Sequence, residues 1–159
     1  MKNKGFTLTE FITAIVVSAL VILATAVLFV AEYRFRADTN NEVYAAREAK
    51  AVMSHMSRTL RFAKPGTVTI STSTLTFTLE GGHLGFAASD TSNTSYSYNS
   101  SSDTVYFKLG GGTAYPIAYD ITYFNPVWNL AAKNFTIDIT AQKGDAKVDL
   151  HTVIYATGS

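Results

Sequence analysis

The hydrophobic and polar positions divide the chain into three stretches with different periods. From Phe11 to Ala31 no charged residue and no proline interrupts an apolar run. A helix over this run would be roughly 30 Å long, about the thickness of the hydrocarbon core of a bilayer. Lys2 and Lys4 precede the run, so we expect the N-terminus to stay in the cytoplasm and the rest of the chain to cross the membrane.

The second stretch, residues 32–64, has the pattern of an amphipathic helix. Five apolar residues recur at spacings of three or four: Ala45, Ala49, Val52, Met56 and Leu60. This spacing places them on one helix face. We therefore expect one long helix from about Phe6 to about Phe62, loosened near residues 38–41. It should stop at Lys64-Pro65-Gly66, because proline disfavours helix in the residue before it.

The third stretch, residues 65–159, alternates with a period of two, which is typical of strands. The expected strands cover residues 68–70, 75–79, 84–88 (the weakest), 105–109, 117–123, 135–142 and 147–155. Loops are expected at residues 89–103, which are almost all polar or tyrosine, and at residues 125–129. The clearest hairpin pairs Phe135–Gln142 with Lys147–Tyr155 across a turn at Gly144.

An apolar alternation on one face indicates an antiparallel sheet with one side on a core. The helix stripe between Ala45 and Leu60 is the available partner for that side. The sequence therefore predicts an α+β fold, with a long N-terminal helix whose second half packs against an antiparallel β-sheet head.

The composition of the 159 residues fits one exported domain with an anchor. There are 13 basic and 12 acidic side chains, so nothing draws the chain strongly toward nucleic acid. The chain has no cysteine, and no disulfide can stabilise the head. Its 13% aromatic content suits a sheet with aromatic cross-strand pairs.

The residues before the apolar run differ from an ordinary secretory signal, whose cleavage site follows a shorter apolar region. Here the only feature resembling a cleavage site, Gly5, lies in front of the run, so a cut there would remove the leader and keep the helix. A basic leader is followed by Gly5, Phe6, Thr7, Leu8, a variable residue, Glu10 and the apolar run. This motif resembles the class III signal of type IV prepilins and pseudopilins.

The resemblance implies that a prepilin peptidase cleaves between Gly5 and Phe6 and that the new Phe6 amine is N-methylated. It also implies a division into a leader (1–5), a transmembrane or filament-core helix (6–31), an amphipathic half (32–64) and a β-sheet head (65–159). Glu10 would pair with the Phe6 amine of a neighbouring subunit and set the register of assembly.

Glu10 needs such a partner on physical grounds. A carboxylate costs roughly 2.5–3.5 kcal/mol at the centre of a membrane helix and less near its end, and such residues are functional by default. The alternative is an acid that the helix dipole favours at the N-terminus. The dipole explains Glu10 but fewer of the residues around it.

A second, more diffuse resemblance narrows the subtype. The stretch from Met53 to Arg61 and the later segment from Asp120 to Phe124 resemble PilW-like minor pilins and J-type minor pseudopilins of type II secretion. Many pilins have a C-terminal disulfide loop, and many major pilins have a proline within the apolar run. This chain lacks both features. The missing disulfide departs from the pilin pattern, and the missing proline suits a minor pilin or a pseudopilin.

The resemblance implies three kinds of partner: other pilins or pseudopilins of the same filament, the prepilin peptidase and the inner-membrane assembly platform. The expected location is the inner membrane, single-pass with the head outside the cytoplasm, and then the pilus or pseudopilus. We expect no cofactor, no metal and no enzymatic activity.

The residues that could bind a metal or act in catalysis form no recognisable site in the sequence. His55, His83 and His151 are scattered, and the spacing of Asp90, Asp103 and Asp120 gives no support for a calcium site. The glycine runs lack the end of a phosphate loop. The only tryptophan, Trp128, is expected to cover the edge of the core, with a partner contact as the alternative.

Four functions stay open. A minor pilin of a type IV pilus is the first choice, and a J-type minor pseudopilin of a type II secretion system is the second. A rival of another class is an uncleaved, membrane-tethered binding domain. An enzyme without a recognisable catalytic cluster comes last.

Overall fold

The computed structural model describes residues 7–80 and 93–157. The chain forms two compact units, residues 1–39 and residues 40–159, and each is described by itself. The long helix α1 runs from Leu8 to Thr59 without a break, and two short 3-10 turns follow, η1 (Leu60–Phe62) and η2 (Pro65–Thr67). The expected loosening near residues 38–41 is wrong. That segment is polar, but it contains neither glycine nor proline, so nothing there breaks the helix.

The second unit contains two antiparallel sheets. The five-stranded sheet has the order β1 (Thr69–Ser71), β2 (Thr74–Thr78), β3 (Asn93–Asn99), β4 (Thr104–Lys108) and β5 (Tyr115–Ala118). The three-stranded sheet has the order β6 (Ile121–Asn129), β7 (Asn134–Lys143) and β8 (Ala146–Tyr155). Each strand pairs with the next along the chain within its sheet, as expected of an antiparallel meander.

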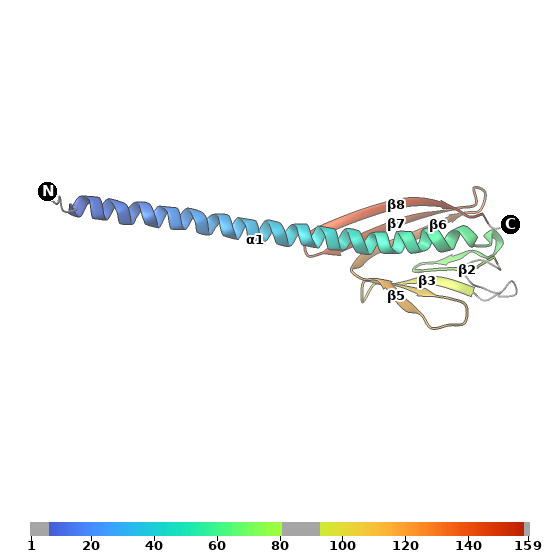
Figure 1. Cartoon of the computed structure of the whole chain (residues 1–159). Coiled ribbons are helices and arrows are strands. Elements are labelled where there is room, and N and C mark those ends of the chain that lie inside the picture. Colours follow the sequence, from blue (N-terminus) through green and yellow to red (C-terminus); the bar gives the residue numbers. More distant parts are fainter. Residues whose placement is uncertain (1–6, 81–92, 158–159) are drawn as a thin grey trace. The chain divides into compact units, whose positions relative to one another are not determined.

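One hydrophobic core joins the helix to both sheets. The stripe predicted from the sequence is confirmed, because Ala45, Ala49, Val52, Met56 and Leu60 are all fully buried. They share a cluster with Phe77 and Tyr96 of the first sheet and Phe135 and Ile137 of the second. Within this unit, Figure 1 shows the green part of α1 running between the β6–β8 sheet and the β2–β5 strands. The α+β expectation is therefore confirmed.

The C-terminal hairpin is also confirmed. Strands β7 and β8 pair over their whole lengths, from Asn134 opposite Tyr155 to Lys143 opposite Ala146. Gly144 occupies the turn with a φ of +58°, which L-residues rarely adopt, and an added Cβ would lie 3.1 Å from the Asn41 side chain. The positive φ favours glycine at this turn, and any side chain here would also have to displace the Asn41 amide by a few tenths of an ångström.

The expectation of a loop over residues 89–103 is wrong from residue 93 to residue 99. These residues form β3, the middle strand of the first sheet, whose inward side chains are Thr94, Tyr96 and Tyr98. Thr94 and Tyr96 are buried, whereas Ser95 and Ser97 lie on the other face. Tyrosine and threonine fit a half-buried sheet well, so they take the places that aliphatic residues would occupy in a more obvious strand.

The expectation of one strand over residues 117–123 is wrong as well. Residues 115–118 form β5 of the first sheet, and β6 of the second sheet begins at Ile121. Asp120 lies between them with a φ of 55°, a value that interrupts the extended backbone. The apolar alternation continues through residues 119 and 120, so the break between the two strands could not be predicted from the hydrophobic pattern.

The expectation of a loop at residues 125–129 is also wrong. These residues complete β6, where Pro126 lies opposite Ile137. Proline is tolerated because β6 is an edge strand. Trp128 is half-buried and its ring centroid lies 4.4 Å from that of Phe135, so it covers the core as expected. The expected weak strand at residues 84–88 lies outside the described residues.

Replacing Tyr96 by alanine should destabilise the head by about 3 kcal/mol or more, because it leaves a cavity in the centre of the first sheet. The variant also removes the 2.7 Å hydrogen bond between the Tyr96 hydroxyl and His55 Nδ1. Denaturant unfolding of the full chain, followed by near-ultraviolet circular dichroism, measures the effect. The matched control is Tyr123→Ala, whose side chain is half exposed. Equal stability of the two variants would contradict the buried position of β3.

Candidate processing and assembly site

The described part of the signal motif begins with a reciprocal cap at the start of α1. Thr7 precedes the first helical residue, Leu8, and Glu10 lies three residues after Thr7. The Thr7 hydroxyl accepts a bond of 3.3 Å from the Glu10 backbone N–H. In return, the Thr7 backbone N–H and hydroxyl each donate a bond of 2.9 Å to Glu10 Oε2. This is a capping box, which satisfies N–H groups that a helix leaves without intrahelical partners.

The cap gives Glu10 an intramolecular role that uses only one carboxylate oxygen. Oε2 accepts both bonds from Thr7, and within the described residues Oε1 accepts none. A carboxylate in the first turn also lies favourably at the positive end of the helix dipole. Among the described residues, Glu10 is therefore held in a defined position through Oε2 alone.

The apolar surface that follows Glu10 is exposed along the whole of the first unit. No residue from Leu8 to Asn40 is buried in the structure. The most apolar 18-residue window of the helix has a mean hydropathy of 2.9, so by length and composition α1 can cross a membrane. A signal sequence would meet the same criterion.

The few hydroxyls inside the apolar run are satisfied by the helix itself. Thr13, Ser18 and Thr25 donate to the backbone oxygens of Thr9, Ala14 and Val21, at distances between 2.6 and 3.0 Å. In hydrocarbon an unsatisfied polar group is costly, so this arrangement removes one obstacle to insertion.

The end of the apolar run has the residues expected at a membrane surface. Glu32 and Arg36 form an ion pair one helical turn apart. Between them, Tyr33 and Phe35 are 77% and 72% exposed. Aromatic and basic side chains are enriched at the interface between lipid and water. This segment fits one border of the stretch that can span a membrane by length and composition.

The structure brings together only part of the predicted site. Thr7, Leu8 and Glu10 are described and lie in or next to the first helical turn. Gly5 and Phe6, the predicted cleavage and methylation residues, lie outside the described residues. Sequence reasoning missed the role of Thr7 in the cap, although a threonine followed by glutamate three residues later is a recognisable capping pattern.

The other candidate residues are engaged elsewhere in the head. His55 is bonded to Tyr96, and His151 Nδ1 lies 2.6 Å from Asp138. Asp103 accepts a bond from Tyr98, and Asp120 pairs with Lys143 at 3.0 Å. In residues 7–80 and 93–157 no three His, Cys, Asp or Glu side chains are grouped to hold a metal. His83 and Asp90 lie outside these ranges.

Replacing Thr7 by valine should weaken the first turn of α1 by about 1 kcal/mol, because the hydroxyl that caps Glu10 is lost. Amide hydrogen exchange at Glu10 should then accelerate about fivefold. The measurement uses the full chain in lipid nanodiscs. Thr13→Val is the control, because the Thr13 hydroxyl donates to a carbonyl and caps nothing. Unchanged exchange in Thr7→Val would show that the cap does not form in the membrane.

Comparison with known proteins identifies the N-terminal region. Residues 1–26 match the family model of the prokaryotic N-terminal methylation motif. No curated protein and no solved structure gives a significant match. The match supports a type IV pilin-like family of structural subunits that a prepilin peptidase processes. It implies association with other pilins and with membrane assembly machinery, and it is consistent with inner-membrane anchoring before assembly.

Proposed function

We propose that the chain is a minor pilin, a structural subunit of a type IV pilus or a related filament. A prepilin peptidase cleaves it between Gly5 and Phe6, and the Phe6 amine is then methylated. The helix of the mature chain leaves the lipid and packs with similar helices in the filament core. The observation that carries the proposal is the match of residues 1–26 to the methylation motif, together with the exposed apolar side chains of the helix that begins within it.

The energetics of assembly support this route. The large apolar side chains from Phe11 to Val30 are exposed in the described part of the chain and require an apolar environment. Lipid and a bundle of like helices both supply one, so transfer between them changes little apolar exposure. Packing and polar contacts between helices must then supply the free energy that favours the filament over the membrane. Glu10 is the one acid in the span and can supply such a polar contact.

The pairing proposed for Glu10 uses the geometry of the cap. Thr7 holds Oε2, and Oε1 stays available for the Phe6 amine of an adjacent subunit. A carboxylate and an amine in an apolar surrounding attract each other far more strongly than in water. The pair would fix the axial offset between neighbouring helices, because few other offsets bring the two groups together.

The second resemblance described above fits a minor pilin and a J-type minor pseudopilin equally, and both functions share the same processing, so a measurement in cells has to separate them. Shearing filaments from cells and probing them for the chain tests the proposal. Recovery of the chain with surface pili supports a minor pilin. Recovery only in the cell envelope together with secretion components supports the pseudopilin. A chain that stays unassembled at precursor length contradicts both and supports a membrane-tethered binding domain.

A further inference from the structure

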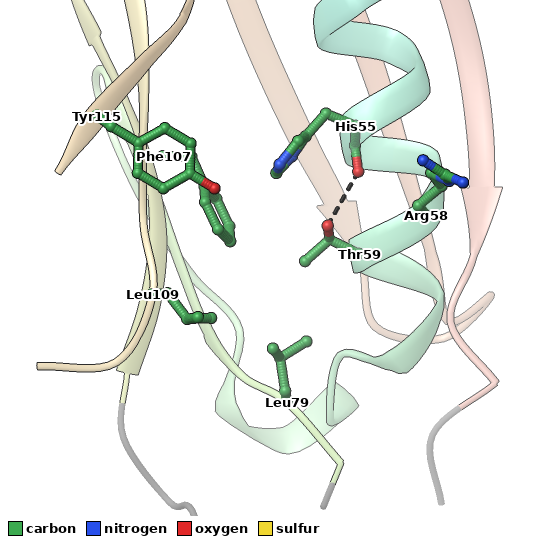
Figure 2. A pocket seen from close by; sticks show the side chains of 7 residues that line it. All are labelled: His55, Arg58, Thr59, Leu79, Phe107, Leu109 and Tyr115. Atoms are coloured by element: carbon green, nitrogen blue, oxygen red, sulfur yellow. Dashed lines mark hydrogen bonds between the residues drawn. The ribbon is translucent and has the colours of Figure 1, made fainter. Parts of the chain in front are cut away.

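The head contains a cavity that the assembly of a filament does not require. It has a volume of about 420 Å³, which lies in the range of small-molecule sites. It lies between the C-terminal part of α1 and the inner face of the first sheet (Figure 2). Six side chains carry the argument: His55, Arg58, Leu79, Phe107, Leu109 and Tyr115.

Aromatic groups form much of the cavity wall. The Phe107 ring meets the His55 ring at 4.6 Å and the Tyr115 ring at 5.6 Å, both edge to face. Figure 2 shows the Phe107 and Tyr115 rings on the sheet side and the His55 ring extending toward them from the helix. Leu79 and Leu109 continue the apolar surface. A flat aromatic body suits such a wall, because offset and edge-to-face ring contacts add to the burial of apolar area.

The polar groups of the cavity favour a ligand that brings hydrogen-bond acceptors and negative charge. His55 Nδ1 is used by the Tyr96 hydroxyl, and burial together with the nearby Arg58 lowers the pKa of His55, so the imidazole is neutral at neutral pH. If Tyr96 donates to Nδ1, Nε2 carries the hydrogen and is a donor.

Arg58 supplies the permanent positive charge. It lies on the helix at the rim of the cavity and is exposed, and no carboxylate lies within 4.0 Å of it among the described residues. No acidic side chain is among the described residues that line the cavity. An arginine binds a carboxylate through two parallel hydrogen bonds, which no neutral ligand group can match.

We infer that this cavity binds a small aromatic carboxylate, with the ring against Phe107 and Tyr115 and the carboxylate toward Arg58. The site lies in the head and is independent of cleavage at Gly5, so either idea can fail without the other. It would make the head a receptor for a small molecule as well as a building block.

Isothermal titration of the full chain in lipid nanodiscs with 2-naphthoate tests the inference, and empty nanodiscs correct for partition into lipid. We expect saturable binding with one site per chain. The uncharged analogue 2-naphthylmethanol should bind about tenfold more weakly, because it cannot form the charge-assisted bonds. Absence of saturable binding, or equal affinity for the two compounds, would overturn the inference.

Two variants locate the site. Arg58→Gln should lower the affinity for 2-naphthoate about tenfold while leaving the affinity for 2-naphthylmethanol unchanged. Its matched control is Arg47→Gln, an exposed arginine on the same helix that does not line the cavity. Leu109→Trp should fill the cavity and abolish binding of both compounds. Because Arg58 is exposed, Arg58→Gln should fold even if Leu109→Trp does not, and an unchanged naphthoate affinity in Arg58→Gln refutes the assignment.

Discussion

Replacing Gly5 by leucine should leave nearly all of the protein at precursor length in the membrane. The proposed cut follows Gly5, where glycine presents its backbone to the peptidase without a side chain. Leucine adds bulk at that position and changes neither the charge of the leader nor the apolar run. The measurement is the length of the membrane-bound chain when the peptidase is present.

The control for this variant is Asn3→Leu, which adds the same side chain to the leader two residues earlier. It should be processed as the unaltered chain is. Both variants keep Lys2 and Lys4, so both should insert with the same orientation. Normal maturation of Gly5→Leu would remove Gly5 as the cleavage residue. Failure of both variants would indicate a general defect of the leader.

Replacing Glu10 by alanine should permit cleavage but reduce incorporation into filaments at least about tenfold. The neighbouring subunit's Phe6 amine would then be buried without a partner, which costs about 3–5 kcal/mol for a buried charge. The measurement compares the variant and unaltered chains in sheared filaments from cells that contain equal amounts of mature protein. Glu32→Ala is the control, because Glu32 lies beyond the apolar run and pairs with Arg36.

A second substitution separates the two roles of Glu10. Glu10→Gln keeps an oxygen that accepts the bonds from Thr7, but it carries no charge. If pairing with an amine decides assembly, Glu10→Gln should incorporate as poorly as Glu10→Ala. If incorporation of Glu10→Gln equals that of the unaltered chain, the cap is the function of Glu10 and the pairing is refuted.

The helical part of the fold could be predicted from the sequence because its signals are local and repeated. The spacing from Ala45 to Leu60 marks one helix face, and all five residues of that stripe are buried. The hairpin of β7 and β8 was equally clear, since long alternating runs flank a glycine turn. In these segments the hydrophobic period and the turn residues predict the same secondary structure.

The missed strands have weaker local signals and depend on their neighbours. Strand β3 buries Thr94 and Tyr96, which read as polar in a run of serine and asparagine. These residues are buried because β3 lies between β2 and β4, and its polar composition gives no sign of that position. Strand β6 includes Pro126, whose presence is acceptable only because the strand lies at an edge. Composition cannot reveal which strand will be central and which will be an edge.

The sequence motif of the candidate site could be predicted, but the hydrogen bonds between its residues could not. The succession from Gly5 to Glu10 pointed to processing, and residues 1–26 match the methylation motif. The reciprocal bonds between Thr7 and Glu10 require coordinates, because the sequence does not show which oxygen accepts them. The cavity beside His55 could not be predicted from the sequence, since its walls come from three separate segments, residues 55–59, Leu79 and residues 107–115.

The most direct test of the account is the mass of the N-terminal peptide of the protein isolated from the cells that make it. Tandem mass spectrometry after digestion identifies both the first residue and any modification on its amine. The account predicts a peptide that begins at Phe6 with a methyl group on its α-amine. A peptide that begins at Met1, with Gly5 and Phe6 still joined, would contradict the account.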